Sequence, residues 1–103
     1  MHIAAVQMEV ADGQPAANRQ ALADQLDNHP GADLYLAPEL WTCGYVQSQW
    51  ARLAAEDTPA SLAWMADEAR RRGVWLGGSL IAADPDGALA NRFVLFDRQG
   101  RLA

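Results

Sequence analysis

The sequence predicts an α/β fold with a mixed sheet. A short, almost unbroken apolar run at residues 34–37 has the composition of a strand buried on both faces. Stretches with helical periodicity at 15–29 and 58–72 separate this run from apolar segments before and after it. Strand, helix and strand with short connections form a βαβ unit, whose strands lie parallel, whereas a tight turn near the end of the sequence favours an antiparallel hairpin.

The first βαβ unit occupies the N-terminal third of the sequence. An apolar strand is expected at residues 2–8. A turn then leads to Pro15, which suits the first position of a helix because the N–H it lacks would be unpaired there. The helix is expected to end near residue 29, and its spacing places Asn18 on the same face as its apolar residues. The strand at 34–37 follows directly.

A second long helix is expected after a less regular stretch. Residues 46–57 favour a short helix around Trp50. Thr58 and the proline after it are typical of a helix start, with the hydroxyl as N-cap and the proline at the first helical position. Gly73 is expected to end this helix, because glycine readily adopts the left-handed conformation that follows many helices.

The C-terminal third is expected to form a hairpin. A strand at 74–83 contains the pair Gly77-Gly78, which indicates close packing or a bulge. The turn at 84–87 contains proline and glycine in favourable positions and leads to a strand at 90–97. Residues 101–103 are expected to begin a further strand.

A single carboxylate follows the buried strand at 34–37. Pro38 ends that strand, because proline has no N–H for the hydrogen-bond ladder, and Glu39 comes next. Ligands usually bind at the carboxyl ends of strands in open α/β sheets. Glu39 is therefore a candidate general base. The alternative is a glutamate that caps a loop or pairs with an arginine.

Three residues near Glu39 are candidates for lining a substrate pocket, namely Trp41, Cys43 and Tyr45. Aromatic residues beside a buried strand are more often part of the core. Cys43 is not the expected nucleophile, since no histidine pattern accompanies it and free cysteines usually behave as small hydrophobic residues. It is expected to be buried or to line the pocket.

Composition excludes several classes of function. The formal charge of −5 makes nucleic acid a poor partner, because phosphate binding needs a basic surface. No apolar stretch reaches the ~20 residues of a membrane span, and neither a signal peptide nor a glycine-rich nucleotide motif is visible. His2 and His29 lack metal-ligand spacing, so no metal site is expected. The lone cysteine fits a reducing compartment, and a cytoplasmic location is expected.

The order of the motifs resembles that of a known family. The strand with Pro38-Glu39, followed by Cys43-Gly44-Tyr45, resembles the first signature of the nitrilase superfamily, the carbon–nitrogen hydrolases. Three other segments resemble parts of that family in the same order, namely Ile3–Met8 (its first strand), Val74–Ser79 (the strand after its second helix) and Asn91–Asp97 with Gly100 (the following hairpin). The resemblance covers the whole sequence but only the front part of the family's domain.

This resemblance implies a fold and an activity. Residues 1–103 would form a single, incomplete domain, the N-terminal part of a four-layer α-β-β-α sandwich. The family hydrolyses amide, carbamoyl or nitrile C–N bonds outside peptides with a Glu-Lys-Cys triad and no cofactor, and Glu39 occupies the place of its general base. Members commonly associate, so a homo-oligomer is expected.

Two members of the family's triad have no counterpart in the sequence. All eight basic residues are arginine, so the lysine is absent, and the family's nucleophilic cysteine belongs to a later motif. The 103 residues alone are therefore expected to be inactive. The main alternative is a catalytically inactive, truncated α/β module that binds a partner or small ligand. The unfinished last strand speaks against that alternative, because a sheet edge is normally paired or covered.

Overall fold

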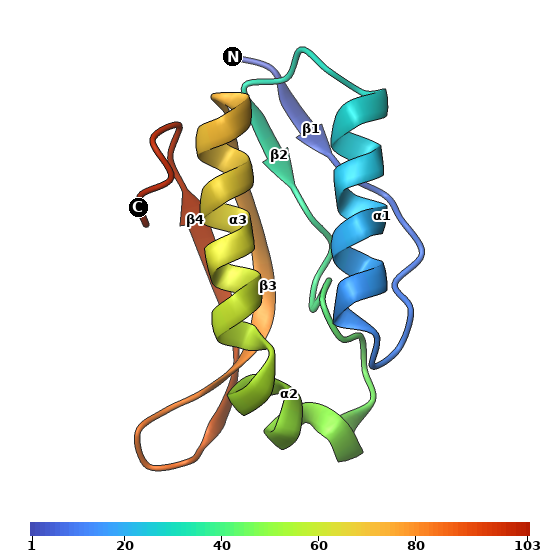
Figure 1. The fold of residues 1–103 in the computed structure, drawn as a ribbon, viewed down its shortest axis with the longest axis vertical. Helices are drawn as coiled ribbons and strands as arrows, with labels where there is room; N and C mark the ends of the chain where they lie inside the picture. The colour runs from blue at the N-terminus through green and yellow to red at the C-terminus, as the bar shows by residue number, and fades with distance from the viewer.

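The computed structural model describes residues 1–103, which form one four-stranded sheet and three α-helices. The elements in chain order are β1 (Ile3–Ala5), α1 (Pro15–Asn28), β2 (Leu34–Leu36), the short 3₁₀ helix η1 (Gln47–Gln49), α2 (Trp50–Glu56), α3 (Thr58–Arg72), β3 (Trp75–Ala83) and β4 (Leu89–Phe96). Figure 1 shows α1 and α3 on the same face of the sheet, with α2 near one end of it. None of the three helices is both long enough and apolar enough to span a membrane.

The sheet has the strand order β1-β2-β3-β4. β1, β2 and β3 are parallel, whereas β3 and β4 are antiparallel. This arrangement follows from the connections, because helices join the parallel strands and a tight turn joins the antiparallel pair. In that turn the Gly87 N–H donates to the Asp84 carbonyl at 2.8 Å. The predicted α/β fold with a mixed sheet is confirmed.

Two sequence-based expectations about element boundaries are wrong. β1 ends at Ala5 rather than at residue 8, because its partner β2 ends at Leu36. The last hydrogen bond between them joins the Val6 N–H to the Leu36 carbonyl at 2.8 Å. Thr58 is the first residue of α3 rather than its N-cap, and its hydroxyl donates instead to the Ile81 carbonyl of β3 at 2.6 Å.

The structure agrees with the expectations for Gly73 and for the pair Gly77-Gly78. Gly73 ends α3 in the left-handed conformation, with φ of 66°, as predicted. The pair Gly77-Gly78 reflects close packing, since the register between β3 and β4 runs without a bulge. A Cβ atom at Gly78 would lie 2.9 Å from Cδ1 of Trp41.

At the end of the chain, residues 101–103 form a single bridge between Leu102 and Phe96 rather than a strand.

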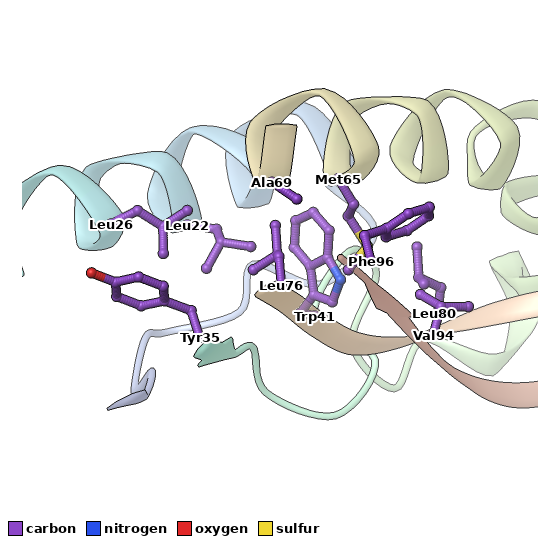
Figure 2. Packing of buried hydrophobic residues seen from close by; sticks show 10 residues of the cluster. All are labelled: Leu22, Leu26, Tyr35, Trp41, Met65, Ala69, Leu76, Leu80, Val94 and Phe96. Carbon is purple, nitrogen blue, oxygen red and sulfur yellow. The ribbon is translucent and has the colours of Figure 1, made fainter. Parts of the chain in front are cut away.

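The main core lies between the helices and the sheet. Figure 2 shows its ten buried residues, which are Leu22, Leu26, Tyr35, Trp41, Met65, Ala69, Leu76, Leu80, Val94 and Phe96. Trp41 is fully buried and packs against Trp64 with ring centroids 5.5 Å apart. Its indole Nε1 is the one buried side-chain polar atom without a hydrogen-bond partner. A residue of the loop after β2 therefore contributes to the centre of this core.

Neither α1 nor α3 covers the other face of the sheet. Because side chains alternate along a strand, the residues on either side of the buried Val94 point to that face. Phe93 of β4 is 58 % exposed there, and Ile3 at the start of β1 is 59 % exposed. The chain thus supplies one helical layer and one sheet, two of the four layers that the sequence resemblance implies.

Candidate active site

Glu39 lies on a sharp turn after β2. Ala37 still follows the sheet, since its N–H donates to the Gly77 carbonyl at 2.8 Å. Pro38 then interrupts the ladder. At Leu40 the backbone adopts a φ of 48°, and Leu40 is the only residue other than glycine with a positive φ. The turn closes where the Gly44 N–H donates to the Leu40 carbonyl at 2.8 Å.

The conformation of Leu40 is strained. A left-handed backbone at a residue other than glycine costs about 1–3 kcal/mol, and it persists only where the surroundings enforce it. The Leu40 side chain is 2 % exposed and packs in a second small core with Cys43, Leu53, Ala54 and Ile81. Its N–H donates to Ser79 Oγ at 2.9 Å. Burial of Leu40 therefore offsets the strain, while the side chain before it, Glu39, stays exposed.

Asn18 of α1 holds the other side of this loop. Its side chain is buried and forms three hydrogen bonds to the backbone. Asn18 Oδ1 accepts the Ala11 N–H at 2.8 Å, and Nδ2 donates to the Ala11 carbonyl at 2.8 Å and to the Thr42 carbonyl at 2.7 Å. One side chain thus joins α1, the segment before it and the loop that carries Glu39.

The Glu39 carboxylate has one direct hydrogen-bond partner. Tyr45 Oη donates to Glu39 Oε1 at 2.6 Å. This hydrogen bond raises the pKa of Tyr45, because the carboxylate favours the protonated phenol. The bond restrains one carboxylate oxygen and leaves the other, Oε2, available to a reacting group.

Glu39 also lines an open cavity of about 350 Å³ with Ala37, Ser79, Asn91 and Phe93. These residues come from the loop after β2 and from the face of β3 and β4 that α1 and α3 leave uncovered. A cavity of similar size, about 370 Å³, lies between β1 and α1, but no carboxylate lines it. A larger cavity of about 430 Å³ is lined by Asp27 and Glu68, but both of these carboxylates pair with Arg72. The cavity beside Glu39 therefore offers a carboxylate that no arginine pairs with, as a general base requires.

The other candidates from the sequence lie in different places. Tyr45 is 61 % exposed and contacts Glu39. Trp41 and Cys43 are both fully buried, so neither lines the cavity beside Glu39. The physical reason is the turn at Leu40, which directs the following side chains into the two cores.

The environment of Cys43 disfavours reactivity. Burial raises the pKa of its thiol, and its Sγ donates a hydrogen bond to the Gly44 carbonyl at 3.3 Å. A buried, protonated thiol is a poor nucleophile, because the thiolate is the reactive form. No group of three or more His, Cys, Asp or Glu residues is placed to hold a metal ion.

Sequence reasoning did not single out Ser79, Asn91 and Phe93 as cavity residues. The sequence held a partial signal for Ser79. Because side chains alternate along a strand, Ser79 points to the same face of its strand as Gly77, two residues before it. To place Ser79 in a cavity, one would also have to know the register between β3 and β4, in which Ser79 pairs with Phe93. β2 and β4 flank β3, so this register places the middle of β4 next to Ser79, across β3 from the loop that follows β2.

Known proteins resemble this chain in sequence over almost its whole length. The family model for carbon–nitrogen hydrolases matches residues 2–103. The 2-oxoglutaramate amidase of Bacillus subtilis (strain 168) is 26% identical over an alignment of 103 positions, which covers 97% of this chain and 39% of the relative.

Solved structures show the same relationship. A CN-hydrolase superfamily protein from Xanthomonas campestris matches with a TM-score of 0.86 and 27% identity, over 99% of this chain and 38% of its own. An amidase from Nesterenkonia sp. matches with a TM-score of 0.84 and 32% identity, over 100% of this chain and 40% of its own. The chain thus spans about two fifths of the length of these relatives, and its fold is that of an N-terminal portion of theirs. Because the family model matches almost every residue, the chain belongs to the carbon–nitrogen hydrolase family.

Proposed function

We propose that this protein hydrolyses the C–N bond of small amides and that Glu39 is the general base. Residues 1–103 would be the N-terminal portion of the catalytic domain. The observation that carries the proposal is the position of Glu39, an exposed carboxylate on a strained turn at the end of β2, beside an open cavity. Such a group can accept a proton from a nucleophile that enters from the open side.

The proposed reaction uses a cysteine as nucleophile. An amidase from Nesterenkonia sp. AN1, which is 30% identical to this chain, has an active-site cysteine to which acrylamide adds. In this proposal Glu39 takes the proton of such a thiol, and the thiolate attacks the amide carbon. The C–N bond breaks, the leaving ammonia or amine takes the proton that Glu39 had accepted, and a thioester remains. Glu39 then activates the water that hydrolyses the thioester.

Two further groups are needed, and residues 1–103 do not supply them. The sequence has no lysine to stabilise the oxyanion of the tetrahedral intermediate, and its one cysteine is buried. Arginine is a poor substitute, because its planar guanidinium differs from an ammonium in reach and geometry. We therefore propose that both groups lie in chain outside residues 1–103 and that these residues alone are inactive.

Small primary amides are the favoured substrates. The Bacillus relative is named for the amide of a 2-oxo acid, and a Nesterenkonia amidase variant is seen in complex with butyramide. Carbamoyl compounds and nitriles are the other substrate classes proposed for this site. A homo-oligomer is proposed for the complete protein, with no nucleic-acid or membrane partner.

The test is ammonia release from butyramide by the protein at its natural length. General-base catalysis contributes about 10²–10⁴-fold, so Glu39→Gln should lower kcat by at least about 10²-fold. Glu56→Gln is the matched control, since Glu56 is an exposed glutamate of α2 outside the cavity. A Glu39→Gln variant with near-normal turnover would contradict the role of Glu39. Residues 1–103 expressed alone should release no ammonia.

The alternative of an inactive module makes a different prediction. The absence of lysine and the buried thiol favour it for a protein that consists of residues 1–103 alone. Such a module should be monodisperse in solution. A fragment of a larger domain should aggregate through the uncovered face of its sheet, where Phe93 is 58 % exposed.

A further inference from the structure

The first two residues after Glu39, Leu40 and Trp41, both bind to one residue of the neighbouring strand, Ser79 of β3. The Leu40 N–H donates to Ser79 Oγ at 2.9 Å, and the Trp41 N–H donates to the Ser79 carbonyl at 3.3 Å. Ser79 is 8 % exposed, so little water can replace its hydroxyl as the acceptor. The side chain and the backbone of one residue thus accept the first two N–H groups after Glu39.

The bond to the Leu40 N–H acts on the peptide that joins Glu39 to Leu40. Leu40 has a φ of 48°, which a leucine avoids in the absence of constraint. The orientation of this peptide determines the direction in which the Glu39 side chain projects from the backbone. Without an acceptor at Ser79, the N–H would be buried and unpaired, and the peptide would be free to turn toward the right-handed conformation.

We infer that Ser79 is a positioning residue for Glu39. It holds the strained turn in the one conformation that directs the carboxylate into the cavity, and it takes no part in the proton transfers. This inference rests on the proposed function, because positioning matters for turnover only if Glu39 is the base. It predicts an effect on kcat rather than on KM, since binding of the amide does not require the exact direction of the carboxylate.

The experiment compares three variants of the protein at its natural length, with butyramide as substrate and ammonia release as readout. Ser79→Ala removes the acceptor and should lower kcat about tenfold, with KM unchanged within about twofold. Ser79→Thr keeps the oxygen and should restore most of the lost kcat. Thr58→Val is the control, because it removes another buried hydroxyl that bonds to β3, at Ile81, away from Glu39. It should leave kcat and KM unchanged.

Hydrogen exchange of the Leu40 amide provides a readout that does not depend on turnover. Leu40 lies outside every helix and strand, yet its amide should be protected in the unmodified protein and exchange faster in Ser79→Ala. An unprotected Leu40 amide would overturn the inference, and so would a Ser79→Ala variant with unchanged kcat. A rise in KM alone would also overturn it, since Ser79 would then contact the substrate.

Absence of ammonia release by the unmodified protein would refute the proposed function and with it a catalytic effect of Ser79. Release by the unmodified protein together with full kcat in Ser79→Ala would refute the positioning role alone. The two failures are therefore distinguishable.

Discussion

Asn18 should be one of the most sensitive positions for stability. Substitution by alanine removes three hydrogen bonds and leaves the Ala11 N–H, the Ala11 carbonyl and the Thr42 carbonyl without their partner. A buried polar group that loses its partner costs about 1–3 kcal/mol. Asn18 is 1 % exposed, but Ala11 is half-buried and water can reach part of it. We therefore expect Asn18→Ala to lower the free energy of unfolding by about 3 kcal/mol.

Urea denaturation followed by tryptophan fluorescence measures this change, since the buried Trp41 lies in the loop that Asn18 holds. Asn28→Ala is the matched control, because Asn28 is an exposed asparagine of the same helix and should cost less than about 0.5 kcal/mol. Asn18→Asp keeps the side-chain volume but removes both Nδ2 donors and places a carboxylate against the Ala11 and Thr42 carbonyls, so it should lower stability without a packing defect. If Asn18→Ala and Asn28→Ala had equal free energies of unfolding, or if Asn18→Asp were neutral at pH 7, the reasoning would be refuted.

Three other changes test other parts of the structure. Cys43→Ala should retain most of the proposed amidase activity of the natural-length protein, because the thiol is buried; a loss as large as that of Glu39→Gln would make Cys43 catalytic. Gly78→Ala should lower the free energy of unfolding by about 1–3 kcal/mol, since its Cβ would lie 2.9 Å from Trp41; an unchanged urea midpoint would contradict this packing. The His2 N–H and then Arg98 hold the pKa of Asp33 below its ordinary value of 3.8, so its stabilisation is complete above pH 3.8 and is lost as the pH falls through the lower folded-state pKa. Asp33→Asn should therefore weaken the acid dependence of unfolding below that pH, and an unchanged dependence would be the contrary result.

Most of the fold could be predicted from local patterns in the sequence. The apolar run before Pro38 and the glycine that ends α3 each act over a few residues, so propensity and periodicity are enough to locate β2 and the end of α3. Thr58 shows where this reasoning fails. Its local pattern is that of an N-cap, but its hydroxyl bonds to Ile81, which lies 23 positions away in the sequence.

The surroundings of the candidate site were less predictable for the same reason. Glu39 could be identified from its place after a buried strand, and its role as a base stays a prediction. The left-handed Leu40, by contrast, has no signature, because leucine is not a residue type that favours a positive φ. Its conformation results from burial against α2 and from Ser79, both of which require the three-dimensional structure. Helical spacing placed Asn18 on the inner face of α1, but not its bond to Thr42.

The intact mass of the protein as its natural source produces it is the most direct test of the claim that these residues belong to a larger hydrolase. Residues 1–103 have a mass of 11.2 kDa and span about two fifths of their relatives. We predict a mass well above 11.2 kDa, with the missing lysine and cysteine in the additional chain. A natural mass of 11.2 kDa would contradict the proposed hydrolase, because the protein would then contain neither the lysine nor an accessible cysteine nucleophile.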